Sequence, residues 1–463
     1  MARIDNLTNF LTDVADSIRS KTGKSETIAA EDFDTEIESI SGGANLQTKS
    51  VTITENGTTS ITPDTGYDGL DEVEVITDVP SESAAEAPER DVNFYDYDGF
   101  RLYSYSKTNF LNLVEMPENP EHSGLIAQGW NYTLEEAKTA INQIEQVNIG
   151  QQYITSDGKT RIYIELVESE RLSPILSFGL NGSATVDWGD GNIEVVSGTS
   201  TTATSNSAVH VQHDYQEIGK YIITIKNDKI IYINSGSSIS SVLLSRRNLT
   251  NNGYRQNFVY LGAIKKIELG NNISLGANAL YSLQNLSTIT IPEDMQISSS
   301  AFKQCIALKY IVIPQSITVI PSYCFNQCYN LKLHLPNRIT SCQTSSLSGL
   351  NISKIIMPFS LTMVAASMFS GDAFLSKIKF YNNITSVGTN AFVGCLGVKI
   401  YDFTNNTVIP QVSSNMFDNY APSDYQILVP QELYNDWIAA DWWKNVNSHI
   451  YAVDSNGNIL PKE

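Results

Sequence analysis

The feature that most constrains this chain is a repeat of 22 residues in its second half. Four prolines recur at this spacing, and each ends a short apolar strand: Pro292, Pro314, Pro336 and Pro358. A second, mostly aromatic column keeps the same register with steps of 22 or 23: Phe302, Phe325, Leu347, Phe369 and Phe392. Two independent columns with one period predict a solenoid, in which stacking buries the apolar side that each repeat alone would expose.

The alternation within each strand predicts which side chains face the interior. Successive side chains of a strand point to opposite faces, so the third and first residues before the proline column share the inner face. This inner set is Ile289, Ile291, Ile311, Ile313, Leu333, Leu335, Ile355, Met357, Ile378 and Phe380. We expect residues 263–400 to form one continuous solenoid with a parallel strand ladder and short helical or irregular turns. The Phe column, with Cys305, Cys328 and Cys395, would fill the opposite wall.

The amino-acid sequence of the repeat also resembles that of a known repeat family. Residues 308–328 read LKYIVIPQSITVIPSYCFNQC and resemble the BspA-like leucine-rich repeats of bacterial surface proteins and phage tail proteins. One repeat departs from that pattern at Cys342, Gln343 and Leu347, so we expect an irregular turn there. Residues 427–445 resemble the strand and helix that often end such arrays. Trp437, Trp442 and Trp443 are then expected in the core of a terminal cap rather than in a sugar platform.

The 463 residues are too many for one ordinary core and predict a multidomain, mainly β protein. Residues 1–43 indicate a helical segment, whose apolar stripe is Leu7, Phe10, Leu11, Val14 and Ile18. Residues 44–80 alternate like the strands of a small β module. Residues 81–90 lack large apolar side chains, as a linker does.

The middle of the chain predicts two further domains before the repeats. Residues 91–149 indicate an α+β unit, with a helix that begins at Thr133 through a capping box with Glu136. Residues 150–230 indicate a β-sandwich, because short strands alternate with Gly and Asp turns. Residues 231–425 would form the solenoid, and residues 426–463 would form its C-terminal cap.

Within the predicted sandwich, residues 187–191 read DWGDG and residues 213–215 read HDY. This two-part motif resembles the polycystic-kidney-disease (PKD) type of immunoglobulin-like domain. The resemblance implies a spacer or a binding module.

Composition excludes several classes of function. The formal net charge of −20 disfavours binding to nucleic acid and to anionic membranes, because both need a basic excess. We find no apolar stretch long enough to insert into a membrane and no ordinary signal peptide. The five cysteines show no C-x-x-C pair and no matching His cluster, so we expect buried apolar fillers with no disulfide framework and no metal site.

An enzyme would need paired carboxylates or a nucleophile with a base. Asp187 with Asp190 lies in a tight turn, and Glu135 with Glu136 opens a helix, so both pairs are expected to have structural roles. Asp187 and Asp190 alone are too few ligands to predict a calcium site. We therefore expect neither catalysis nor a cofactor.

The N-terminal half resembles segments at the front of tail-fibre and baseplate proteins of phages that infect gut Firmicutes. The segments are NLTNFLTDVADSIRSKTG, VTITENGTTSITPDTGYDGLDEVEV, DVNFYDYDGFRLYSY, GLIAQGWNYTLEEAK and NIGQQYITSDGKTRIYIEL. This resemblance implies a virion protein whose N-terminus attaches to other tail or baseplate proteins. Its solenoid would bind a bacterial surface glycan or protein, in a homotrimer or, second, a homodimer. The alternative is a bacterial cell-surface adhesin.

The outward positions of the repeat strands suggest where a receptor would bind. The fourth residues before the proline column are Lys266, Thr288, Tyr310, Lys332, Lys354 and Lys377, and the second residues are Glu268, Thr290, Val312, His334, Ile356 and Lys379. Four lysines in one row of an acidic protein would form a basic stripe that attracts an anionic polymer. The predicted receptor residues are Lys266, Tyr310, Lys332, His334, Lys354, Lys377 and Lys379. Alternatively, the lysines only keep an exposed sheet soluble.

Overall fold

The computed structural model describes part of the 463-residue chain. The described residues are 15–16, 18–20, 46–53, 69–77, 86–167, 173–200, 209–233, 244–245, 263–413, 415–417 and 424–462. The chain divides into two compact units, Met1–Ala85 and Glu86–Glu463, and each is considered by itself.

In the first unit, residues 15, 16 and 18–20 are helical, and Ala15 and Ile18 are buried. The other members of the predicted attachment stripe, Leu7, Phe10, Leu11 and Val14, lie outside the described residues. Strands β1 (Leu46–Ile53) and β2 (Gly69–Thr77) pair in parallel, as part of the small β module predicted here.

The second unit begins with a four-stranded sheet in the order β4-β3-β6-β5. Its elements are β3 (Val92–Tyr95), β4 (Arg101–Tyr105), α3 (Lys107–Asn112), β5 (Leu125–Trp130), α4 (Leu134–Ile141) and β6 (Val147–Thr155). The capping box predicted for α4 is confirmed, because the Thr133 N–H donates to Glu136 Oε2 at 2.8 Å and the Glu136 N–H donates to Thr133 Oγ1 at 3.2 Å. Phe94, Phe110 and Trp130 are buried in the core of this α+β unit.

Two predicted boundaries of this unit were wrong. Strand β6 runs across the boundary placed between residues 149 and 150, so the unit extends to Thr155. Residues 86–90, predicted as part of a linker, are bound to the unit. The Ala87 N–H donates to the Arg101 carbonyl, and the Gln146 amide donates to Glu89 Oε1 at 2.8 Å.

An antiparallel β domain follows, centred on the long strand β8 (Ile175–Asp187). Strand β8 pairs with each of β9, β10, β11, β12 and β13. The strands are β7 (Thr160–Leu166), β9 (Ile193–Ser200), β10 (Val209–Gln212), β11 (Gly219–Asn227), β12 (Ile231–Ile233) and β13 (Leu244–Ser245). The two halves of the DWGDG and HDY motif meet here. His213 stacks on buried Trp188 at 4.8 Å, and the Tyr215 hydroxyl donates to the Trp188 carbonyl at 2.8 Å.

The β domain and the solenoid share one sheet. Strand β7 pairs antiparallel with β14 (Ile264–Glu268), and β14 pairs in parallel with β16 (Thr288–Thr290). At this junction a Cβ atom on Gly270 would lie 2.3 Å from the Gly158 carbonyl oxygen, so the close approach requires glycine. The β domain therefore covers the first edge of the ladder, which would otherwise expose unpaired backbone groups.

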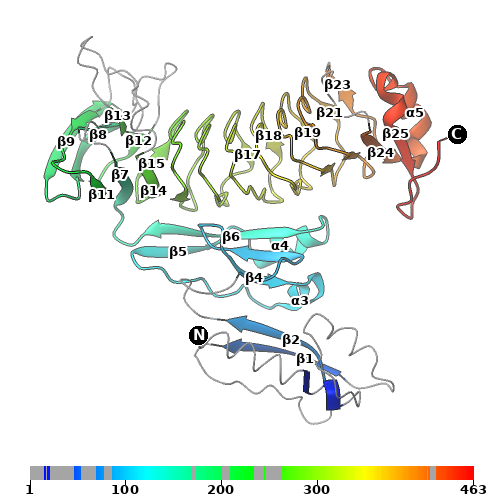
Figure 1. Ribbon diagram of the computed structural model, residues 1–463, viewed down its shortest axis with the longest axis horizontal. Coiled ribbons are helices and arrows are strands. Elements are labelled where there is room, and N and C mark those ends of the chain that lie inside the picture. Colours follow the sequence, from blue (N-terminus) through cyan, green and yellow to red (C-terminus); the bar gives the residue numbers. More distant parts are fainter. Residues whose placement is uncertain are drawn as a thin grey trace. The chain divides into compact units, whose positions relative to one another are not determined.

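The solenoid has two parallel ladders joined by regular turns (Figure 1). The first ladder continues from β16 through a Tyr310–Lys332 bridge to β20 (Lys377–Lys379), β22 (Ile400–Asp402), β24 (Gln426–Pro430) and β25 (Ile450–Val453). The second comprises β15 (Ile273–Leu275), β17 (Val319–Ile320), β18 (Ser341–Cys342), β19 (Met363–Val364), β21 (Ser386–Val387) and β23 (Gln411–Val412). The predicted parallel ladder is confirmed.

The turns are more regular than predicted. Each has two left-handed residues, in two columns that keep the period. The first column is Asn278, Ser300, Tyr323, Ser345, Ser367 and Asn390, and the second is Ser282, Gln304, Gln327, Gly349, Gly371 and Gly394. Backbone N–H groups of one turn donate to carbonyls of the next, as from Phe302 to Cys324 at 3.1 Å. The turn after Cys342 keeps both columns, at Ser345 and Gly349, so its backbone conformation is regular. Its hydrogen bonding is not, because the Leu350 N–H donates to Asp372 Oδ1 at 2.5 Å, whereas the equivalent N–H groups of Cys305 and Cys328 donate to carbonyls of their own turns.

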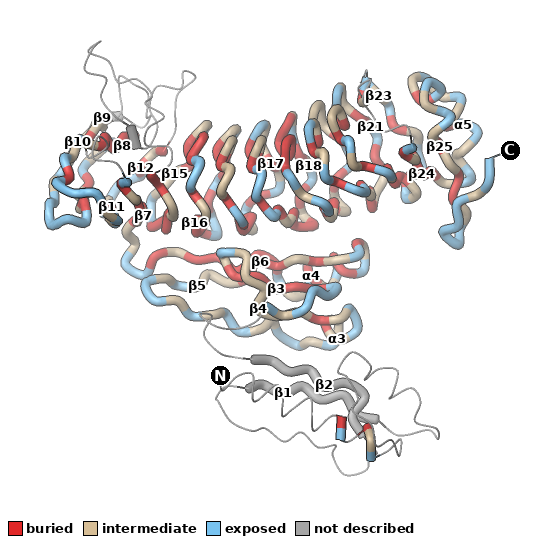
Figure 2. The backbone as a smooth tube through the Cα atoms, viewed as in Figure 1, coloured by how far each residue is buried: buried red, intermediate tan, exposed pale blue. Residues whose placement is uncertain are grey.

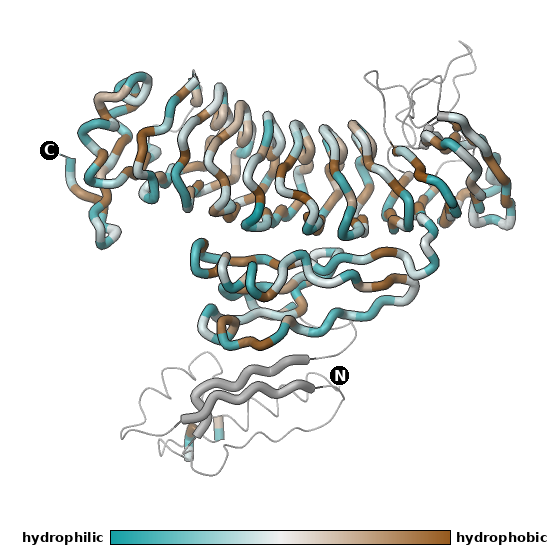
Figure 3. Tube along the Cα trace, turned by 180° about the vertical axis from the view of Figure 1, so that it is seen from behind, coloured by the Kyte–Doolittle hydropathy of each residue, from teal (hydrophilic) through white to brown (hydrophobic). Residues whose placement is uncertain are grey.

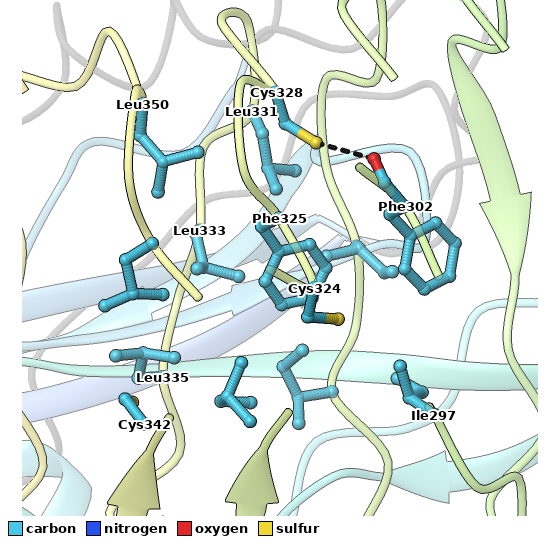
Figure 4. Close-up of a cluster of buried hydrophobic side chains, with 14 of the residues drawn as sticks. Ile297, Phe302, Cys324, Phe325, Cys328, Leu331, Leu333, Leu335, Cys342 and Leu350 are labelled. Atoms are coloured by element: carbon cyan, nitrogen blue, oxygen red, sulfur yellow. Dashed lines mark hydrogen bonds between the residues drawn. The ribbon is translucent and has the colours of Figure 1, made fainter. Parts of the chain in front are cut away.

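All ten predicted inward side chains of the strands are buried. Figure 2 shows buried segments recurring in successive coils, and Figure 3 shows hydrophobic segments doing the same. On the opposite wall Phe302 stacks on Phe325 at 5.7 Å, and the Cys328 Sγ–H donates to the Phe302 carbonyl at 3.0 Å (Figure 4). All five cysteines are buried without a disulfide, and burial raises the pKa of Cys342 to about 12. They are core fillers, as predicted.

The C-terminal end of the solenoid is covered by the predicted cap. It comprises η4 (Gln431–Leu433), α5 (Tyr434–Ala439) and η5 (Trp443–His449) beside β24 and β25. Trp437 and Trp443 are fully buried, and Trp443 Nε1 donates to the Pro410 carbonyl at 2.8 Å. Trp442 is partly exposed. The cap core predicted from these tryptophans is therefore confirmed for Trp437 and Trp443.

Candidate binding surface

The α+β unit packs against the outer face of the first ladder. The Tyr95 ring lies 5.5 Å from Tyr310 and 4.7 Å from His334. Strand β6 comes so close that a Cβ atom on Gly150 would lie 2.8 Å from Val312. These contacts shield the middle of the ladder from water.

Contacts from three consecutive residues of the α+β unit, Trp130, Asn131 and Tyr132, fix its position. Asn131 Nδ2 donates to the Ile313 carbonyl at 3.0 Å, while Asn131 Oδ1 accepts the Gly150 N–H at 2.8 Å. The Trp130 carbonyl accepts from Gln315 at 3.0 Å, and the Asn131 carbonyl accepts from Arg338 at 2.7 Å. The Arg338 guanidinium also lies 5.6 Å from the Tyr132 ring centre. Directional bonds of this kind select one docking geometry, because buried polar groups lose free energy when left unpaired.

The prediction of a fully exposed outer row was therefore wrong for its first part. Tyr310 is 2% exposed and Val312 is 4% exposed. Lys266 lies 5.2 Å from the Tyr97 ring centre and forms an ion pair with Glu268 at 2.8 Å. Burial, with smaller contributions from Lys332 and Arg101, lowers the pKa of His334 to about 3, so its imidazole is neutral. Alternation defines the side of the strand, but it does not show that a second domain covers that side.

The later lysines of the row do reach solvent, but acids neutralise two of them. Lys332, Lys354 and Lys377 are exposed, and Lys379 is partly exposed beside the Tyr381 ring at 5.1 Å. Lys354 lies 3.7 Å from Glu145, and Lys377 lies 3.0 Å from Asp402. Among the described residues no carboxylate lies within 4.0 Å of Lys332. The field of the row is thus weaker than four lysines suggest, and its role in receptor binding stays a prediction.

A cleft of about 100 Å³ lies where the α+β unit meets the solenoid. The α+β unit contributes six residues to its lining: Glu89, Tyr132, Ile144, Gln146, Val147 and Asn148. From the solenoid it is lined by Leu333, His334, Leu335, Lys354, Ile355 and Ile356. Two predicted receptor residues, His334 and Lys354, therefore share one site with side chains that the sequence did not place there. Junctions between domains are common positions for ligand sites.

The carboxylate pairs considered for catalysis have structural partners. Asp187 accepts the Gly189 N–H at 2.9 Å. Asp190 pairs with His213 Nε2 at 2.7 Å; burial opposes its ionisation, but hydrogen bonds from His213 and Asn192 hold its pKa below the ordinary value. Glu136 caps α4. Where the structure describes the chain, no group of three or more His, Cys, Asp or Glu side chains could hold a metal ion, and no helix is both long and apolar enough to span a bilayer.

Comparison with known proteins agrees with the repeat. Residues 220–332 and 295–422 match the model of the BspA type leucine rich repeat region, in six copies, so the solenoid consists of BspA-type leucine-rich repeats. The matched range begins inside β11. No curated protein sequence matches the chain.

Three solved structures are similar at low identity. A leucine-rich repeat protein from Bacteroides ovatus has 16% identity and a TM-score of 0.31, over 44% of this chain and 57% of that chain. The T. pallidum leucine-rich repeat protein has 21% identity and a TM-score of 0.24, over 36% and 82%. A leucine-rich cell surface protein from Faecalibacterium prausnitzii has 16% identity and a TM-score of 0.22, over 43% and 71%.

Proposed function

We propose that this chain is a non-enzymatic binding protein of a phage tail, in which residues 86–463 recognise a receptor on a bacterial surface. The observation that carries the binding role is the cleft between the α+β unit and the solenoid. Its walls come from two elements held by the directional bonds of Asn131, so they are ordered before a ligand arrives. Such preorganisation reduces the entropy lost on binding.

In this proposal the other parts of the chain attach the binding region to the virion and hold it away from the tail. The N-terminal segments, through their resemblance to tail proteins, attach the chain to the tail or baseplate within the virion. The β domain acts as a spacer of the PKD-like type, a role supported by the packing of Trp188, His213 and Tyr215. The receptor is a surface glycan or protein, and the assembly is a homotrimer or, second, a homodimer. No cofactor takes part.

A bacterial cell-surface adhesin is the second candidate. It is favoured by the BspA-type repeats, because repeats that resemble these also occur in bacterial surface proteins.

Mass spectrometry of purified phage particles and of host cell-wall fractions separates these candidates. We expect the protein in particles, and we expect a chain that lacks residues 1–43 to be absent from them while it still binds cells. Detection in the walls of uninfected cells, and never in particles, would favour the adhesin. Incorporation of the truncated chain would place the attachment region elsewhere.

A further inference from the structure

The cleft beside His334 has the chemical character of a small polar ligand site. Apolar side chains form part of its lining: Ile144, Val147, Ile355 and Ile356. Ile356 is only partly buried, so its carbon atoms are available to a ligand. A surface of this kind suits the C–H groups of a ring that also carries polar substituents.

Two amide side chains in the cleft use only part of their hydrogen-bonding capacity within the protein. Gln146 Nε2 donates to Glu89 Oε1 at 2.8 Å and to the Arg90 carbonyl at 3.0 Å, which leaves Gln146 Oε1 as an acceptor. Asn148 Oδ1 accepts from Asn93 at 3.1 Å, which leaves the Asn148 amide N–H groups as donors. In the part of the chain that the structure describes, neither remaining group has another partner. The cleft thus presents a donor and an acceptor within one small space.

His334 adds a polar group that carries no charge. Its Nδ1 is buried and has no hydrogen-bond partner among the described residues. Burial keeps the imidazole neutral, as described above. The buried Nδ1 is out of reach of a ligand, so His334 contributes a neutral wall that attracts no ions.

The charges at the rim oppose one another. Lys354 lies 3.7 Å from Glu145, and Glu89, the other charged residue that lines the cleft, lies 3.9 Å from Arg101. A balanced rim gives no net field to select an anion. Balanced charge, mixed amide groups and an apolar wall together favour a ligand rich in hydroxyl groups and without charge.

We propose that this cleft binds one uncharged saccharide residue of the bacterial surface polymer. The inference rests on the proposed function, because it names the ligand class of the receptor site. A cavity of about 150 Å³ holds a benzene ring. The cleft of about 100 Å³ therefore admits one edge of a sugar ring, and the rest of the polymer stays in solvent.

The test uses the full chain and a variant that fills the cleft. Saturation-transfer NMR would measure binding of glucose, galactose, rhamnose and N-acetylglucosamine to wild type and to Ile356→Trp. The matched control is Ile222→Trp, which adds the same ring at a position on β11 that is 42% exposed and outside the cleft. We expect at least one sugar to bind wild type and the control, with affinity reduced by about tenfold or more in Ile356→Trp. Equal binding by all three proteins, or binding of no sugar, overturns the proposal.

Adsorption to a panel of gut Firmicutes strains separates this proposal from the function on which it rests. If wild type adsorbs to cells and the same sugar inhibits adsorption, both proposals are supported. If adsorption is equal for wild type and Ile356→Trp and only anionic wall polymer competes, the saccharide site is wrong but the receptor-binding role stands. If no strain is bound, the proposed function fails, whatever NMR shows for the cleft.

Discussion

The outer face of the solenoid sheet is covered in the earlier repeats and open to solvent in the later ones. In the earlier repeats its outward positions hold Tyr310, Val312 and His334, and the α+β unit covers them. Two repeats beyond His334 the same positions hold Lys377 and Lys379, which reach solvent. The inner face is apolar in both parts. A strand with apolar residues on both faces therefore marks a second covering layer, whereas lysines mark the open part of the same ladder.

The largest loss of stability is expected when an outward residue of the covered repeats is replaced by the residue that the open repeats have at the same position. Tyr310→Lys places a charge at a position 2% exposed, beside the Tyr95 ring. A buried charge without a partner costs about 3–5 kcal/mol, so we expect a loss of that size in the free energy of unfolding, or release of the α+β unit. Chemical denaturation and limited proteolysis would measure these effects.

The matched control is Lys377→Tyr, which places the aromatic residue in the open part. We expect a clearly smaller loss than in Tyr310→Lys, because Lys377 is exposed and its buried partner Asp402 keeps the hydrogen bonds from the Thr404 N–H and hydroxyl. Equal losses in the two variants would contradict the division of the face.

Asp372 tests whether the shared inner face excludes charge in the open repeats too. It stands where other repeats have Cys305, Cys328 and Cys395 and is fully buried. Its Oδ1 accepts the Leu350 N–H at 2.5 Å, and within the described part of the chain Oδ2 has no partner. Burial raises the pKa of Asp372 well above its ordinary value, although backbone hydrogen bonds from Leu350 and Gly349 oppose the shift.

The sign of the pH effect follows from that raised pKa. The protonated carboxyl contributes its full stability below the unfolded pKa of about 3.9, and this stability is lost as the pH rises toward the folded pKa. Each pH unit in that window costs about 1.4 kcal/mol. We therefore expect the Tm of wild type to fall with pH relative to Asp372→Asn. Asp441→Asn, at an exposed site, should not change the pH profile. Parallel profiles for wild type and Asp372→Asn would show that Asp372 is not the titrating group.

The sequence predicted the periodic features and missed the contacts between distant segments. The inward side chains, the cysteine fillers and the cap core at Trp443 depend on neighbours in the same or an adjacent coil, and the capping box of Thr133 depends on a residue three positions later. Local patterns encode such neighbours. The cover over Tyr310 comes from residues more than 150 positions earlier, and no period connects them. One signal was available, because Tyr310 and Val312 make that strand apolar on both faces.

The cleft could not be predicted for the same reason. Gln146 and Asn148 belong to a strand of another sheet, and only docking brings them beside His334 and Lys354. Rows counted from the proline column identified His334 and Lys354, but not the groups that complete the site.

Removing one docking bond should have an intermediate effect. Asn131→Ala leaves the buried Gly150 N–H without its partner, and it removes one of the two donors to the Ile313 carbonyl, which also accepts from Arg338 at 3.2 Å. An unsatisfied buried group costs about 1–3 kcal/mol, so we expect a loss in that range, with protease sensitivity appearing first in residues 86–155. Asn142→Ala, at an exposed position after α4, is the control and should lose less than about 0.5 kcal/mol. If both variants lose the same, the docking is not held by Asn131.

The smallest effect is expected from the lysines of the open row. Changing Lys332, Lys354 and Lys377 to Gln removes three positive charges, two of which are already offset by Glu145 and Asp402. The Lys354–Glu145 pair is exposed and contributes about 0–1 kcal/mol. Asp402 is buried but keeps its hydrogen bonds from Thr404, so the free energy of unfolding should change little. If the cleft is the receptor site, cell adsorption should fall by less than about twofold at physiological salt, where screening acts over about 8 Å. Adsorption measured at low and at high salt shows whether the cleft or the lysine row binds the receptor. A large loss confined to low salt would assign receptor binding to the lysine row, because only a field of exposed charges is screened in that way.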